Sequence, residues 1–319
     1  TLGALALFSG NVWFLFAVLF LMGTQSAFFG PLKYSILPVH LKESQLIGAN
    51  SLIEAGTFLA ILAGTIAGGL LILTGYGIAV VSALVLTLAG LGYAASRFIP
   101  DAPAAAPDLN INWNVVDESW RMVSKAASVR FSRLTILGIS WFWLVGATIL
   151  SLFPAIASDL LNGDETVVTL FLVLFTVGIA IGSMLCNRLL KGQVTAIHAP
   201  FGALGITIFI ADFSFALMNH QPAAGGELMG GLTFLSHWTN LRMMLDLIGV
   251  ALFGGIFIVP LYAILKARSD DEDRSRTIAA NNILNAFFMK AGAGSVAALF
   301  GAGVRNPVVL MGIAALNFN

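Results

Sequence analysis

The sequence "SAFFGPLKYSILPVHLKESQLIGAN" (Ser26–Asn50) lies between two long apolar runs and interrupts them with two prolines, Pro31 and Pro38. A shorter echo, "VPLYAILKARSDDEDRSRTIAAN", occupies Val259–Asn281. Because proline fixes φ and lacks an amide donor, each segment predicts the end of one helix and the start of the next. Both segments also place lysines at the edge of apolar sequence, so the role of those charges has to be explained.

The composition predicts an integral membrane protein. Hydrophobic residues make up 58% of the 319 residues and charged residues only 10%, whereas soluble domains carry about 25% charged residues. The apolar runs reach the length of about 20 residues that a helical span needs, and the short alternating segments of barrel strands are not seen. The fold class is therefore an all-α, polytopic helical membrane protein.

Composition also excludes several functions. The formal net charge of zero argues against electrostatic binding of nucleic acid, and one cysteine, Cys186, excludes a disulfide framework and a cysteine-rich metal site. No histidine is followed five residues later by aspartate, as an acyltransferase motif requires, and neither a phosphate-binding loop nor a Ser/His/Asp set is found. We therefore expect no enzyme, no metal and no cofactor in this chain.

Apolar periodicity and charge breaks predict eight complete spans and a partial span at each end. The chain starts at Thr1 without Met and ends in an apolar segment too short to cross a membrane, so we expect a piece of a longer protein cut within a helix at both ends. The complete spans are predicted at about 11–29, 49–73, 75–99, 132–157, 166–190, 197–218, 243–266 and 277–301.

The distribution of lysine and arginine predicts the orientation, because cytoplasmic loops are enriched in both. If the Lys33 loop is cytoplasmic, only Arg242 and Arg305 fall outside, and Lys290 falls within a span. The other 13 of the 16 basic residues are then cytoplasmic: Lys33, Lys42, Arg97, Arg121, Lys125, Arg130, Arg133, Arg188, Lys191, Lys266, Arg268, Arg274 and Arg276.

A cytoplasmic segment divides the chain into two membrane parts, at 1–99 and 132–319. Within the linker at 100–131, "PDAPAAAP" predicts an extended stretch. The following sequence predicts an amphipathic helix with Val116, Trp120, Val123 and Ala127 on one face. That helix either lies on the inner leaflet or is a plain connector.

A repeat relates the two parts. "IGANSLIEA" at 47–55 aligns with "IAANNILNA" at 278–286, and "GPLKYSIL" parallels "VPLYAIL" just upstream. An even number of spans separates the copies, so they share one topology. Parallel repeats of this kind are typical of transporters built from two six-helix halves. We therefore expect a two-lobed, twelve-span plan of which this chain starts late in span 3 and ends early in span 12.

Two segments carry a resemblance to a known family. "SAFFGPLKYSILPVHLKESQLIGANSLIEAGTFLAILAGTIAGG" resembles the bacterial lysophospholipid transporter family of the major facilitator superfamily. "SWFWLVGATILSLFPAIASDLLNGDETVVTLFLVLFTVGIAIGSMLC" is similar to a subgroup fused ahead of a glycerophospholipid acyltransferase and an acyl-carrier-protein ligase. The stand-alone transporters have an arginine where this chain has Leu150, so a mechanism that uses that arginine does not carry over.

The resemblance implies a secondary transporter that flips lysophospholipid, chiefly lysophosphatidylethanolamine, to the inner leaflet of the bacterial inner membrane for re-acylation. The implied partners are the lysophospholipid, membrane lipids, and acyltransferase and ligase domains, fused or separate. Two alternatives stay open: a facilitator with another small-molecule cargo, and a membrane anchor for a fused acyltransferase.

Lys33 and Tyr34 are the first candidates for substrate binding. In this superfamily the corresponding span lines the central cavity, so Lys33 is expected to bind a headgroup phosphodiester while Tyr34 donates a hydrogen bond. Alternatively, Lys33 extends to the membrane surface and only sets topology. Trp143 is a further candidate, either lining an acyl-chain slot or packing within the bundle.

Polar residues within the spans supply the other candidates. Asn50 and Glu54 share one helical face, and Asn281 and Asn285 repeat their spacing, so these four either bind the headgroup or form interhelical hydrogen bonds. For Glu54, pairing with Lys33 and uptake of a proton are further alternatives. A lysine near the middle of the bilayer needs a partner, since the charge costs at least about 2.5 kcal/mol there. We therefore predict that Lys290 either pairs with an aspartate or contacts the headgroup. Asp212 is at similar depth and is the expected partner, whereas Asp246 lies further outward.

Overall fold

The computed structural model describes residues 2–41, 43–102, 114–190, 195–220, 228–269 and 274–318. The chain forms two compact units, the N-terminal unit Thr1–Trp113 and the C-terminal unit Asn114–Asn319. Among the described residues, seven helices are long and apolar enough to cross a membrane: Val12–Gly30, Gly77–Ser96, Arg130–Leu160, Glu165–Leu190, Ala199–Asn219, Trp238–Ala267 and Ser275–Gly301. The predicted all-α, polytopic membrane fold is confirmed.

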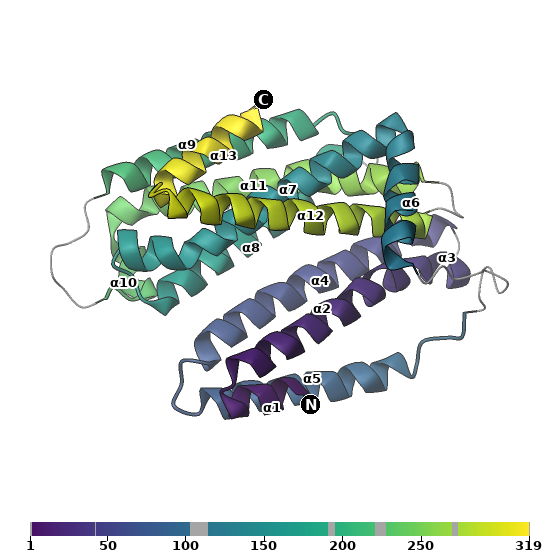
Figure 1. The fold of residues 1–319 in the computed structure, drawn as a ribbon, viewed down its shortest axis with the longest axis horizontal. Helices are drawn as coiled ribbons and strands as arrows, with labels where there is room; N and C mark the ends of the chain where they lie inside the picture. The colour runs from purple at the N-terminus through teal and green to yellow at the C-terminus, as the bar shows by residue number, and fades with distance from the viewer. Residues whose placement is uncertain are drawn as a thin grey trace. The chain divides into compact units, whose positions relative to one another are not determined.

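The described part of the N-terminal unit contains the helices α1 to α5 (Figure 1). The first helix is α1 (Leu2–Ser9), which packs against α2 (Val12–Ser35) and α5 (Gly77–Ser96). The helix α1 ends where Gly10 adopts φ +60°. A new helix, α2, then begins because the Asn11 side chain accepts a hydrogen bond from the Phe14 amide at 3.1 Å and caps it. The short α3 (Leu37–His40) connects α2 to α4 (Glu43–Leu71), the helix at the second predicted span.

The C-terminal unit is arranged around α11 (Trp238–Ala267), which packs against α7, α8 and α9 (Figure 1). The last helix, α13, packs along α9, and α12 packs against α7 and α6. The other elements are α6 (Val115–Ser128), α7 (Arg130–Ala155), a π turn η1 (Ile156–Leu160), α8 (Glu165–Leu190), α9 (Ala199–Asn219), α10 (Gly231–Ser236), α12 (Arg274–Gly301) and α13 (Asn306–Phe318).

Phenylalanines form a cluster within the largely aliphatic core of the C-terminal unit. Phe153 on α7, Phe171 on α8 and Phe234 on α10 are fully buried. The Phe171 ring contacts both of the other rings edge-on, at centroid distances of 5.5 and 5.7 Å. These contacts connect the short α10 to α7 and α8.

Glycines allow α8 and α11 to approach backbone to backbone. A Cβ atom on Gly182 would lie 1.9 Å from the carbonyl oxygen of Leu252, and one on Gly255 would lie 2.6 Å from the amide nitrogen of Ser183. No larger residue fits at either position without moving a helix. Gly178 and Gly182, four residues apart, are therefore the sequence signal for this close packing.

The predicted amphipathic helix is present as α6, but its apolar face is divided. Met122, Val123 and Ala126 pack into a cluster with residues of α7, α11 and α12. Val116 and Trp120, which the sequence places on the same face as Val123, are 80% and 72% exposed. The helix therefore turns its second half toward the bundle, while the choice between a surface helix and a connector stays open.

Both copies of the predicted repeat lie in the same local setting. The copy at 47–55 is in α4 and the copy at 278–286 is in α12, in each case in the first half of a long helix. The long helix before each copy has a proline near its end, Pro31 in α2 and Pro260 in α11, but the short α3 lies between α2 and α4. The local correspondence is compatible with a repeat, and the symmetry between two halves stays a prediction.

Candidate binding site

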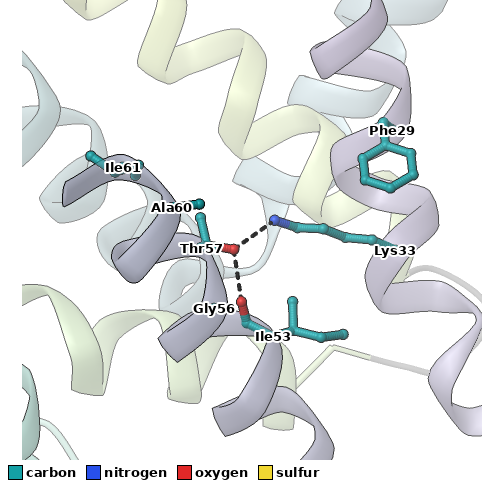
Figure 2. Close-up of a pocket in the computed structure, with 7 residues that line it drawn as sticks. All are labelled: Phe29, Lys33, Ile53, Gly56, Thr57, Ala60 and Ile61. Atoms are coloured by element: carbon teal, nitrogen blue, oxygen red, sulfur yellow. Dashed lines mark hydrogen bonds between the residues drawn. The ribbon is translucent and has the colours of Figure 1, made fainter. Parts of the chain in front are cut away.

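A groove in the N-terminal unit contains the lysine singled out by the sequence. Its volume is about 620 Å³, within the range of about 300–1,000 Å³ that ligand sites in proteins occupy. We call it the Lys33 groove, and its lining consists of Phe29, Lys33, Ile53, Gly56, Thr57, Ala60 and Ile61 (Figure 2).

Helix periodicity assembles the groove from α2 and α4. Phe29 and Lys33 are four residues apart on α2, so they lie on one face, and the lining residues of α4 recur at the same three- or four-residue spacing. The Lys33 Nζ donates a hydrogen bond to Thr57 Oγ1 at 3.4 Å, and Thr57 Oγ1 donates to the Ile53 carbonyl at 2.7 Å (Figure 2). Thr57 therefore helps to hold the lysine ammonium at an otherwise apolar groove.

Thr57 is the residue that the sequence reasoning missed. It lies three residues after Glu54 and seven after Asn50, so it extends the polar face of α4 by one turn. The side chains of Tyr34, Asn50 and Glu54 lie outside the described residues, although their backbone positions are helical. Their roles in substrate binding stay predictions.

The two asparagines of the C-terminal unit differ from each other. Asn285 is buried, and its Oδ1 accepts a hydrogen bond from Ser140 Oγ on α7 at 2.8 Å. Asn281 is completely buried one turn earlier, yet neither atom of its amide has a hydrogen-bond partner among the described residues. Asn285 thus forms one of the interhelical hydrogen bonds that the sequence analysis considered. The Asn281 amide group makes no hydrogen bond among the described residues, so it could still bind a polar group.

Substitution of Ser140 by alanine is expected to lower the free energy of unfolding by about 1 kcal/mol, because it removes the only side-chain bond shown for the buried Asn285 carbonyl. Thermal unfolding of the detergent-purified protein measures the change. Ser151→Ala is the matched control, since Ser151 is exposed and donates only to the carbonyl of Thr148 on its own helix. Equal midpoints for the two variants would show that the interhelical bond contributes no stability.

The aromatic residues of α7 make polar contacts as well as packing contacts. Trp143 is 40% exposed and its Nε1 donates to the Tyr262 hydroxyl on α11 at 2.9 Å. Trp141 donates to Asn317 Oδ1 at 2.8 Å, and Asn317 in turn donates to the Ala203 carbonyl on α9 at 2.9 Å. Trp141 therefore joins three helices, while Trp143 stays a candidate for contact with an acyl chain.

The predicted partner of Asp212 needs correction. Asp212 on α9 pairs with Arg242 on α11: Nε donates to Oδ2 at 3.0 Å, and the Nη2 group donates to Oδ1. Lys290 is exposed on α12, which packs mainly against α7 and α6, whereas α9 packs against α11 and α13. The Lys290–Asp212 pair is therefore not formed in the described C-terminal unit, because the two helices are not direct neighbours.

The geometry of the Lys33 groove suits one chemical class of ligand. An ammonium group attracts an anion, and in apolar surroundings the attraction is stronger than in water. The apolar side chains beside it offer contacts to a hydrocarbon chain but few hydrogen bonds. The groove can therefore bind an amphiphile whose anionic group lies at Lys33.

Comparisons with known proteins agree with this chemistry. The lysophospholipid transporter LplT of Escherichia coli O157:H7 is 30% identical over 303 residues, which cover 92% of this chain and 68% of that protein. The lysophospholipid transporter LplT of Escherichia coli strain K12 is 29% identical over 303 residues, with the same coverage of both chains. No family model matches this chain, and no solved structure matches it.

Proposed function

This chain belongs to the lysophospholipid transporter family, and from that premise we propose that it moves lysophospholipids across the bacterial inner membrane as a secondary transporter. The observation that carries the proposal is 30% identity to the lysophospholipid transporter LplT over 92% of the chain. The multi-pass helical fold supports it, because a transporter needs several helices to enclose a path through the membrane.

The Lys33 groove supplies the binding chemistry in this proposal. A lysophospholipid has one acyl chain and a phosphodiester anion, and the groove offers one ammonium and an apolar lining. The Lys33 Nζ binds the phosphodiester, with Thr57 holding the ammonium in place. Tyr34, Asn50 and Glu54 extend the polar side of the site, and Glu54 binds the ethanolamine ammonium. The acyl chain lies along Phe29, Ile53 and Ile61.

The direction of movement and the partners are part of the same proposal. The distribution of lysine and arginine supports a cytoplasmic Lys33 loop. Lysophosphatidylethanolamine then moves to the inner leaflet, where acyltransferase and acyl-carrier-protein ligase domains, fused or separate, restore the second acyl chain. Movement follows from rocking of two membrane halves around a site near the middle of the bilayer.

The lining of the groove favours a lipid over a sugar. Sugar sites need many hydrogen-bonding side chains, whereas Lys33 and Thr57 are the polar side chains among the seven residues that line this groove. The observation supports the lysophospholipid as cargo over another small polar solute.

Translocation of labelled lysophosphatidylethanolamine by the full-length protein in proteoliposomes tests the function. The fraction of label that albumin extracts from the outer leaflet reports the movement with time. We expect faster loss of extractable label than in protein-free vesicles, and no comparable movement of a labelled sugar. Equal rates with and without protein would contradict transport and leave the membrane-anchor alternative.

A further inference from the structure

A second groove lies on the C-terminal unit, far along the chain from Lys33. Its volume is about 490 Å³ and it lies along α9 and α13, which pack side by side (Figure 1). We call it the Asp212 groove, and its lining consists of Ile208, Phe209, Ala211, Asp212, Phe215 and Met311. All of these side chains except Asp212 are apolar.

An ion pair lies at this groove and is accessible. The Arg242 and Asp212 side chains are 51% and 39% exposed, although both lie on candidate spans. The guanidinium of Arg242 also lies 5.6 Å from the centre of the Phe215 ring, which lines the groove. A positive and a negative group are therefore both presented beside apolar surface.

A second carboxylate lies behind the pair. Asp246 is one turn after Arg242 on α11, within electrostatic reach of Arg242 and Asp212, and it is only 3% exposed. Its Oδ2 is buried and has no hydrogen-bond partner among the described residues. Buried polar atoms without a partner are rare, so this oxygen points to a missing donor. The cluster holds two carboxyl groups and one guanidinium, and the Asp246 carboxyl interacts with that of Asp212, so an added ammonium would be attracted by both acids.

We propose that the Asp212 groove is a second binding site for a lysophospholipid with a zwitterionic phosphoethanolamine headgroup. The phosphate binds Arg242, the ammonium binds Asp212 and approaches Asp246, and the single acyl chain lies along Phe215 and Met311. The inference rests on the proposed function, since it names a further site for the same class of substrate.

Exchange of ion-pair partners explains why a zwitterion fits. An anion that binds Arg242 alone leaves the Asp212 carboxylate without its guanidinium partner, so the charge-assisted hydrogen bonds between α9 and α11 are lost. A zwitterionic headgroup replaces the Arg242–Asp212 ion pair by two, one between its phosphate and Arg242 and one between its ammonium and Asp212. A lysophospholipid with a phosphoglycerol headgroup lacks the ammonium and is therefore expected to bind this groove more weakly.

Photolabelling of the full-length protein in proteoliposomes tests the site. Lysophosphatidylethanolamine with a photoreactive acyl chain is irradiated, and mass spectrometry maps the labelled peptides. We expect labelling of α9 and α13 at Phe215 or Met311. In Arg242→Gln we expect labelling to fall by at least about tenfold, because the loss of a hydrogen bond to a charged group weakens binding by about that factor or more. Equal competition by diacyl phosphatidylethanolamine would overturn the proposal, because the groove would then hold ordinary membrane lipid.

A charge exchange separates binding from structure. The double variant Asp212→Arg/Arg242→Asp retains an ion pair between α9 and α11 but reverses its direction relative to the groove. We expect this variant to fold and yet to lose labelling, whereas labelling at the original level would show that the pair is only structural. The matched control exchanges Asp117 and Arg121, an exposed ion pair on α6 at 3.9 Å, and is expected to label normally.

Transport measured on the same vesicles distinguishes the two proposals. If the protein translocates lysophospholipid but α9 and α13 are not labelled, the second site is overturned and the proposed function stays intact. Labelling without transport supports the site and contradicts the function.

Discussion

Substitution of Lys33 by alanine is expected to lower the rate of lysophospholipid translocation by at least about tenfold, because a hydrogen bond between charged groups contributes about 1.5–3 kcal/mol. Lys33 supplies the only charge among the residues that line its groove, so no neighbour there replaces the ammonium. The translocation assay in proteoliposomes measures the effect at matched protein content. Lys33→Arg keeps the positive charge and is expected to retain part of the rate.

Two further variants sharpen the interpretation of Lys33. Thr57→Val removes the acceptor of the 3.4 Å bond but keeps the shape, so a smaller loss of rate is expected than for Lys33→Ala. Lys125→Ala, on α6 and outside the groove, removes an exposed lysine and is the matched control. If Lys33→Ala and Lys125→Ala both transport at the wild-type rate and express normally, Lys33 does not bind the headgroup.

Substitution of Gly182 by alanine is expected to destabilise the C-terminal unit by about 3 kcal/mol or more, at the upper end of the cost of overpacking. The added Cβ would lie 1.9 Å from the Leu252 carbonyl oxygen and 2.7 Å from its carbon, so α8 and α11 would have to separate. Both contacts are with backbone, so a change of rotamer does not relieve them. Thermal unfolding and size-exclusion chromatography in detergent measure the loss of folded protein.

Gly146→Ala is the control with the opposite expected sign. A Cβ on Gly146 in α7 meets nothing within 4 Å, and alanine favours a helix by up to about 1 kcal/mol over glycine. This variant is therefore expected to be as stable as the wild type or more so. A Gly182→Ala protein that unfolds at the same temperature as Gly146→Ala would show that the α8–α11 contact does not determine stability.

Part of the candidate site could be predicted from sequence. Lys33 was singled out because it follows Pro31 at the end of a span within a segment that resembles a transporter family, and the Lys33 groove has this residue in its lining. Thr57 was missed because a threonine in a helix commonly bonds its own backbone, as it does here to Ile53. Only the tertiary structure, which brings Lys33 of α2 within 3.4 Å of Thr57 on α4, shows that the same hydroxyl also accepts from Lys33.

The pairing of charges could not be predicted. The position of each residue along its predicted span favoured Lys290 as the partner of Asp212, because both lie well inside their spans. The structure pairs Asp212 with Arg242 because α9 packs against α11, while Lys290 faces away from the described bundle on α12. Two residues at the same depth in the membrane form an ion pair only if their helices are neighbours and both side chains face the contact between them. Depth can be read from the sequence, but neither of these conditions can.

The sequence by itself determined that this chain is a bundle of membrane helices and which segments form the long helices, but not the short α3 and α10. Those properties depend on contiguous residues, since a span satisfies its backbone hydrogen bonds internally and needs only sufficient apolar length. Tertiary structure alone decided that Gly182 contacts Leu252 and that Arg242 forms its ion pair with Asp212. It also decided that α6 packs only part of its apolar face against the bundle. Those outcomes depend on which helices are neighbours and how each is rotated, and side-chain packing between distant segments sets both.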